Sequence, residues 1–169
     1  MKSRLDQFRA PRNALLALLL CVSPAWAQVP GPAPLELRLA DVGRFASFVD
    51  MGSRQPDGSA VQVRVLQVAE ADFEVAGEAY WGGWRREVID CPARTLAHAG
   101  FSSLRATGRE GPVMGDRRPA VVPAAGGTDA AVLKVVCDGW KPFAKVPVAS
   151  SVEDAVRIGR PLIETGAEP

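Results

Sequence analysis

Hydrophobic and polar residues alternate over much of the middle of the chain, a pattern that is typical of β-strands. In the run 61–68, the valines at odd positions share one face. Leu66 and Val68 fall on the opposite parity. We therefore expect either that both faces of this strand are covered or that a bulge resets its register.

A shorter alternating run at 44–50 precedes this strand, and the segment between the two contains Pro-Asp-Gly. Pro56 favours the backbone angle of a turn and Gly58 allows a positive φ, so we expect a hairpin. The run 35–40 also alternates. It predicts a short first strand, with the start of a helix as the alternative.

Two further strands are predicted downstream. We expect Gly82 and Gly83 to break the chain into a loop and a strand that runs from about Trp84 to Cys91. Pro92 cannot donate a backbone hydrogen bond, so it ends this strand or places it at an edge.

The stretch RTLAHAGFSSLRATG predicts a fourth strand, which brings Leu96, His98 and Phe101 near the core. The stretch 109–127 that follows is rich in glycine, proline and charge. It predicts a long loop, whose role the sequence leaves open.

Later in the chain, the hydrophobic period changes to that of a helix in the stretch TDAAVLKVVC. This spacing puts Leu133 and Cys137 on one face. Thr128 or Asp129 is expected to cap the start of the helix and Gly139 its end. The three valines leave a strand as the alternative.

The C-terminal segment contains a serine followed three residues later by a glutamate, Ser150 and Glu153. This capping-box pattern predicts a short helix to about Arg157. We expect Gly159 and Pro161 to end it.

The first 27 residues have the pattern of a secretory signal peptide. Four basic residues precede a short apolar run at 14–22, and Ala25 and Ala27 frame a cleavage site. We expect cleavage after Ala27, followed by a proline-rich, extended leader at 28–35. The apolar run is too short to span a membrane.

Cleavage would remove four of the 20 basic residues and one of the 19 acidic residues, which leaves 142 residues with a formal net charge of −2. Such a chain lacks the basic footprint of a nucleic-acid-binding protein and the polybasic cluster of an anionic-membrane binder. Its length fits one domain.

Export also simplifies the cysteines. Cleavage of the signal peptide would remove Cys21. Bacterial lipidation signals have a small residue directly before the cysteine, whereas this chain has Leu20, so we do not expect lipidation there. Cys91 and Cys137 remain. Two cysteines in an oxidising compartment predict one disulfide, with two separate buried thiols as the alternative.

No pattern in the sequence points to catalysis. The sequence contains one histidine, His98, but no glycine-flanked serine that could act with it as a nucleophile. No HxxH or CxxC spacing predicts a metal site. Asp50 and Asp90 each end a strand-like run, and we interpret them as turn-capping groups rather than an acid–base pair. We predict a non-enzymatic protein without cofactor or metal.

Three aromatic residues, Tyr80, Trp81 and Trp84, cluster around two glycines. Aromatic residues dominate binding hot spots, so these three form the candidate binding patch if they reach the surface. If they are buried, they belong to the core.

The order of these motifs resembles that of the surface-adhesin protein E-like family of exported bacterial proteins. The matching residues, within 44–140, are Phe48-Val49-Asp50, Ser53, Gly58, Val61, Val63, Val88-Ile89-Asp90-Cys91 and Val135-Val136-Cys137. The resemblance implies an antiparallel sheet with a helix tied to it by Cys91–Cys137, and adhesion to host proteins. Many members are lipoproteins, a feature that this signal sequence does not share.

We therefore predict an α+β fold, an antiparallel β-sheet with a C-terminal helix packed on it and stapled by one disulfide. The predicted parts are the signal peptide 1–27, the leader 28–35, a surface-adhesin protein E-like domain 36–146 and a tail 147–169. The predicted function is an exported, adhesin-like binding module for a protein or cell-envelope ligand, at the cell surface or in the periplasm. A homodimer is left open, and a periplasmic structural or envelope-maintenance protein is the alternative.

Overall fold

The computed structural model describes residues 33–116 and 118–167. The predicted signal peptide with Cys21 and its cleavage site, and most of the leader 28–35, lie outside the described residues. Within the described ranges, no helix has the length and apolar character that crossing a bilayer requires.

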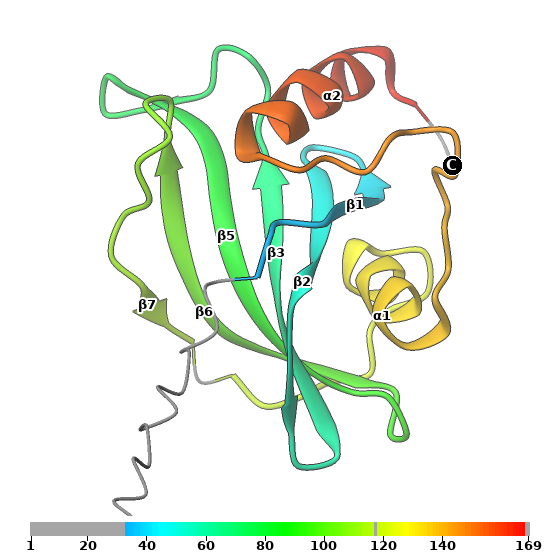
Figure 1. Cartoon of the computed structure of the whole chain (residues 1–169). Helices are drawn as coiled ribbons and strands as arrows, with labels where there is room; N and C mark the ends of the chain where they lie inside the picture. Colours follow the sequence, from blue (N-terminus) through cyan, green and yellow to red (C-terminus); the bar gives the residue numbers. More distant parts are fainter. Residues whose placement is uncertain (1–32, 117, 168–169) are drawn as a thin grey trace, which may run out of the picture. The chain divides into compact units, whose positions relative to one another are not determined.

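The fold is built on one antiparallel sheet, as predicted. Its strands are β1 (Leu37–Val42), β2 (Ala46–Asp57), β3 (Ala60–Val68), β4 (Glu74–Val75), β5 (Glu78–Asp90), β6 (Thr95–Arg105) and β7 (Met114–Gly115). Their order is β1-β2-β3-β5-β6-β7 (Figure 1). The short β4 pairs with the start of β5. Every strand thus pairs with a neighbour in sequence, except where the short β4 intervenes.

Two helices complete the fold, α1 (Thr128–Asp138) and α2 (Val152–Thr165). The predicted late helix is confirmed as α1, and the alternative of a strand there is wrong. Gly139 ends α1 with a φ of 64°, as predicted. The disulfide is also confirmed, because Cys91, directly after β5, is bonded to Cys137 of α1, with a Cα–Cα distance of 5.5 Å.

The change of parity in β3 reflects two separate cores. Val65 packs in one cluster with Val132 of α1, and Leu66 packs in another cluster with Ala155 of α2. Adjacent residues of a strand point to opposite faces, so the two helices cover opposite faces of the sheet. The register of β3 with β5 is uninterrupted, which excludes the alternative of a bulge between these two strands.

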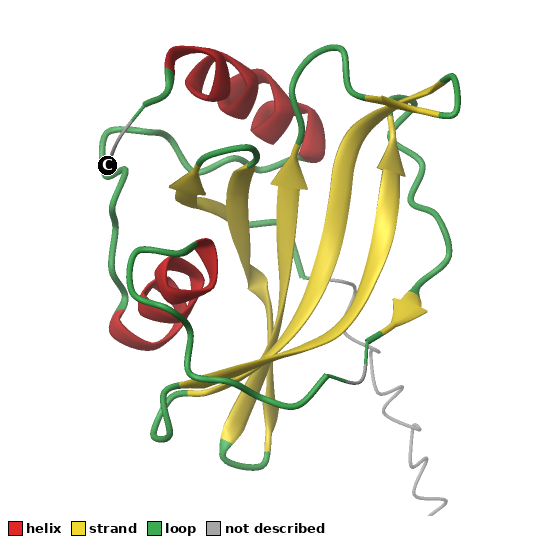
Figure 2. Cartoon of the chain, turned by 180° about the vertical axis from the view of Figure 1, so that it is seen from behind, coloured by secondary structure: helices red, strands yellow, loops and turns green. Residues whose placement is uncertain are grey.

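The sheet is strongly twisted, and its long strands converge toward one end when it is seen from behind (Figure 2). Helix α1 contacts β1 and β2 at one edge of the sheet, and it also contacts β6 near the opposite edge. The sheet therefore curls around α1, and residues of β5 and β6 reach the start of that helix.

The paired glycines do not interrupt β5, which corrects the prediction of a break. A Cβ at Gly82, where φ is 137°, would stand 1.8 Å from the backbone oxygen of Gln67. A Cβ at Gly83 would stand 2.4 Å from the ring of Phe101. These glycines let a neighbouring strand and a ring approach closely, and the strand continues through them.

The predicted hairpin, which is formed by β2 and β3, has a tighter turn than expected. Gly58, with a φ of 61°, and Ser59 form the turn between β2 and β3, and Asp57 pairs with Ala60. Pro56 lies within β2 rather than in the turn.

Helix α2 begins at a different serine from the predicted one. The hydroxyl of Ser151 accepts a hydrogen bond of 3.1 Å from the backbone N–H of Asp154, so Ser151 is the N-cap. Ser150 instead donates to the carboxylate of Asp154. The prediction of a serine N-cap is therefore confirmed, but the capping serine is Ser151 and not Ser150.

Helix α2 also continues through Gly159 and Pro161, where the prediction ended it. A Cβ at Gly159 would stand 2.9 Å from the Cβ of Ala46 in β2. The glycine therefore allows close packing of the helix on the sheet. The segment 147–169, predicted as a tail, contains a 14-residue helix that completes one of the two cores.

Candidate functional site

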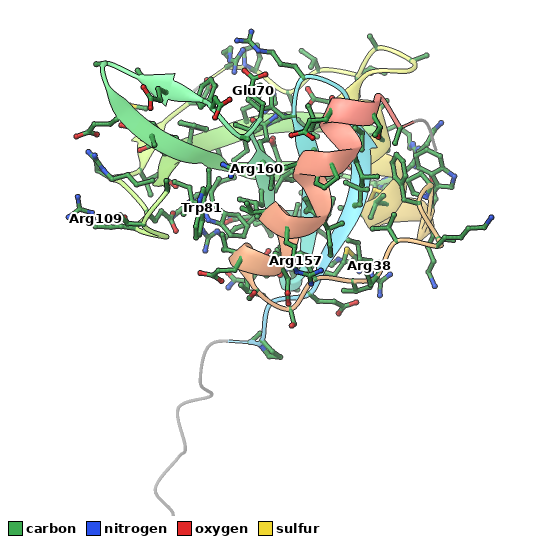
Figure 3. All side chains as sticks on the ribbon, turned by 90° about the horizontal axis from the view of Figure 1, so that it is seen from above. Arg38, Glu70, Trp81, Arg109, Arg157 and Arg160 are labelled. Atoms are coloured by element: carbon green, nitrogen blue, oxygen red, sulfur yellow. A yellow bond between two sulfur atoms is a disulfide. The ribbon has the colours of Figure 1, made fainter. Side chains whose placement is uncertain are left out.

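The three candidate aromatic residues do not form one exposed patch. Trp84 is 3% exposed and lies in the α2-side core, with its ring 4.1 Å from the guanidinium carbon of Arg64. Tyr80 and Trp81 are half-buried. Seen from above, Trp81 and Arg109 lie on the same side of α2 (Figure 3). Trp84 is thus a core residue, as the buried alternative required.

Asp90 caps a turn, as interpreted from the sequence, but Asp50 lies within β2, next to an irregularity in its pairing with β3. Asp50 is buried and its Oδ1 accepts hydrogen bonds from the backbone N–H groups of Glu36 and Gly52. Asp90 accepts a hydrogen bond of 2.9 Å from the backbone N–H of Ala93. Each carboxylate is thus occupied with backbone N–H groups, those of its own turn for Asp90 and those of β2 and the segment before β1 for Asp50.

His98 lies in a network of charged side chains that the sequence did not predict. We call it the His98 cluster, and its members are Arg85, Glu87, His98 and Asp129. Glu87 Oε2 lies 2.8 Å from His98 Nδ1, and Asp129 Oδ2 lies 3.4 Å from His98 Nε2. Arg85 forms ion pairs with both carboxylates, at 2.6 Å to Glu87 and 2.5 Å to Asp129.

The donor roles in the His98 cluster follow from its charges. Arg85 Nη2 also lies 2.9 Å from His98 Nδ1, and one of its two N–H groups donates to Asp129. A carboxylate can only accept, so we assign the Nδ1 proton to the bond with Glu87. Both ring nitrogens of His98 therefore face a carboxylate.

Glu87 is the buried member of the His98 cluster, with a fully buried side chain. Burial removes its carboxylate from water and raises its pKa above the usual 4.5, although Arg85 and His98 oppose this effect. Glu87 Oε1 contacts Arg85 only as an ion pair and accepts no hydrogen bond from the described residues.

A cavity of about 360 Å³ adjoins the His98 cluster. Asp116 and Arg118 also line it, and the side chain of Arg118 donates hydrogen bonds to the carboxylate of Asp116. These bonds lower the pKa of Asp116 to about 2. Every charged side chain that lines this cavity has a partner of opposite charge. The cavity therefore offers little uncompensated charge to a ligand.

A signal for the His98 cluster was present in the sequence. Glu87 has the parity of Ile89 and Cys91, so it shares one face of the predicted strand with two apolar residues. An acid at such a position needs a partner, and the only histidine was predicted near the core on the next strand. Asp129 carried no comparable signal, because we expected it to cap α1. The N-cap is Gly127, without a side-chain hydrogen bond.

The most exposed aromatic surface lies elsewhere, after α1. We call it the Trp140 surface. It comprises Arg38, Lys134, Trp140, Lys141, Phe143 and Val148. Trp140 is 38% exposed and Val148 is 53% exposed. An apolar cavity of about 200 Å³ lies between this segment and β1.

The charge at the Trp140 surface is positive. The chain has four lysines, and apart from Lys2 all of them fall within 134–145. Lys134 Nζ lies 5.1 Å from the ring centroid of Trp140, and Lys141 lines the cavity. Among the described residues, none of these three lysines has a carboxylate within ion-pair distance.

The concentration of lysines around Trp140 is visible in the sequence, but none of these residues was among the predicted site residues. Comparison with protein-family models, with curated proteins and with solved structures finds no match to this chain.

Proposed function

We propose that the protein is a non-enzymatic, exported binding module that recognises a protein segment carrying both acidic and apolar side chains. The Trp140 surface is its recognition site. The observation that carries the proposal is an exposed tryptophan beside an apolar cavity, surrounded by lysines that have no acidic partners.

The chemistry of the surface selects the ligand. A partly exposed tryptophan is the commonest type of binding hot spot, since it contributes a large apolar area at low entropic cost. The cavity of about 200 Å³ holds an apolar side chain rather than a whole cofactor. Lys141 and Lys134 attract carboxylates and increase the rate of association with an acidic partner.

The His98 cluster supports a role other than catalysis. A general base needs a ring nitrogen that can reach the proton of a substrate. In His98 both ring nitrogens face carboxylates, and Arg85 closes the network. The cluster connects β5 and β6 to the start of α1, which is a structural use of these charges.

The adhesin-like part of the proposal is supported by the resemblance to the surface-adhesin protein E-like family and by the Cys91–Cys137 disulfide. A disulfide fits an exported protein, because export places the chain in an oxidising compartment. The ligand would then be a protein of the host or of the cell envelope.

The test is selection of peptides from a random phage-displayed library on the immobilised protein. We expect enriched peptides that combine aspartate or glutamate with leucine or phenylalanine. Trp140→Ala should abolish the enrichment, and Lys141→Glu should weaken it. Val122→Ala is the matched control, because Val122 is 71% exposed in a different loop. Peptides that bind Trp140→Ala as well as the unmodified protein would overturn the proposal.

A further inference from the structure

A second polar cavity lies on β2, β3 and β5, away from the Trp140 surface. Its volume is about 350 Å³, within the roughly 300–1,000 Å³ of small-ligand sites. Its polar lining consists of Ser53, Gln55, Gln62, Arg64 and Arg86. Glu87 also borders it, but that carboxylate is engaged by Arg85 and His98.

Two arginines stand directly opposite each other in this cavity. Arg64 of β3 pairs in register with Arg86 of β5, so their side chains emerge on the same face of the sheet. Like charges at directly opposed positions destabilise a sheet. Arg86 is exposed and makes no side-chain hydrogen bond or ion pair with the described residues. Glu110 offsets the charge of Arg64, and the guanidinium group of Arg86 is left without a partner among the described residues.

Arg64 is held in a fixed position. Its guanidinium lies over the ring of Trp84, and its Nη2 donates a hydrogen bond of 2.8 Å to Glu110. Ser102 donates a further bond of 2.6 Å to Glu110, which fixes that carboxylate in turn. The charge of Arg64 is thus already balanced by Glu110, so Arg86 supplies the uncompensated positive charge of this cavity and Arg64 a fixed guanidinium beside it.

The remaining polar groups of the cavity, the side-chain amides of Gln55 and Gln62, are suited to hydrogen bonds with the hydroxyl groups of a ligand. Gln62 donates its amide nitrogen to Asp57, which leaves the side-chain oxygen as an acceptor. Gln55 is exposed opposite Gln62 and provides a second amide. Ser53 is used within the fold, because it donates to the backbone oxygen of Asp50. The cavity therefore combines donors for an anion with amides for neutral hydroxyls.

We propose that this Arg64–Arg86 cavity binds an acidic saccharide of the uronic acid class. The sugar carboxylate would lie against Arg86 and Arg64, and its hydroxyls against Gln55 and Gln62. The site is separate from the Trp140 surface, so this proposal does not depend on the proposed function.

Isothermal titration calorimetry of the purified protein with sodium glucuronate tests the proposal. We expect saturable binding, with glucose, the uncharged sugar, binding about tenfold more weakly or not at all. Arg86→Gln should lower the affinity for glucuronate by about tenfold or more, because it removes the charge and keeps a polar side chain. Arg64→Met is less informative, since it also removes the contact with Trp84.

Two controls make the result decisive. Arg44→Gln, which changes an exposed arginine in the loop between β1 and β2, should bind glucuronate as the unmodified protein does. Trp140→Ala should also leave it unchanged. Absence of glucuronate binding, or equal binding by Arg86→Gln, would overturn the site. Inorganic phosphate that binds as tightly as glucuronate would show that only the charge is recognised and would overturn the saccharide assignment.

Discussion

Glu87 and His98 form a buried pair that joins β5 to β6. Glu87 Oε2 lies 2.8 Å from His98 Nδ1, and the side chain of Glu87 is fully buried. The other ring nitrogen of His98 faces Asp129 at the start of α1. The pair therefore ties two strands and a helix together, at the cost of burying a carboxylate.

This pair predicts a specific pH dependence of stability. The pKa of Glu87 is raised above 4.5 by burial, so between pH 4.5 and the raised value the folded state holds a proton that the unfolded state releases. The free energy of unfolding therefore decreases as the pH rises through this window. In Glu87→Gln this contribution is absent.

Urea denaturation at a series of pH values measures the difference. Relative to Glu87→Gln, the unmodified protein should lose stability as the pH rises from 4.5. Glu153→Gln, at an exposed position of α2, should follow the unmodified protein at every pH. Parallel curves for Glu87→Gln and the unmodified protein would contradict the prediction.

Substitution of two tryptophans should destabilise the protein to very different extents. Trp84→Ala removes a core side chain that is 3% exposed and should lower the free energy of unfolding by roughly 3–5 kcal/mol. Trp140→Ala changes a 38% exposed side chain and should cost less than about 1 kcal/mol. Thermal unfolding of both variants measures this, and equal destabilisation would show that Trp140 also serves the core.

Gly159 should not tolerate a methyl group, although alanine favours helices by about 1 kcal/mol over glycine. The added Cβ would stand 2.9 Å from Ala46 and 3.1 Å from the ring of Phe48. Gly159→Ala should therefore destabilise the protein by about 1–3 kcal/mol in urea denaturation. Gly43→Ala is the matched control, since nothing lies within 4 Å of a Cβ there. A stabilised Gly159→Ala would mean that α2 packs less closely than described.

The disulfide should contribute strongly to stability. Cys91 and Cys137 are separated by 46 residues, and the loop-entropy relation gives about 4 kcal/mol for such a loop. The double variant Cys91→Ala/Cys137→Ala should unfold at a correspondingly lower urea concentration. A reducing agent should destabilise the unmodified protein and leave the double variant unchanged; insensitivity of both would mean that the bond does not form in the cell.

The location of the protein separates the proposed function from its alternative, a periplasmic structural or envelope-maintenance protein. Protease treatment of intact producing cells should remove an adhesin-like protein from the surface. A protein that survives until the outer membrane is opened is periplasmic, and host adhesion would then be excluded. N-terminal sequencing of the exported protein should begin at Gln28.

The antiparallel sheet, helix α1 and the pairing of Cys91 with Cys137 could all be predicted from the sequence. Alternation of polar and apolar residues is a local property, and it directly reports which face of a strand is buried. The opposite parities of Val65 and Leu66 even indicated a strand with both faces covered. The predicted removal of Cys21 with the signal peptide would leave two cysteines, which allow only one intramolecular pairing.

Only the tertiary structure decided which distant side chains meet. Asp129 lies 44 residues from Arg85, and the twist of the sheet around α1 brings them within 2.5 Å. Close packing also reversed two local signals, because Gly82 and Gly159 allow neighbouring segments to approach where glycine usually ends an element. Contact between segments that are distant in sequence depends on how elements pack, and no local pattern encodes that packing.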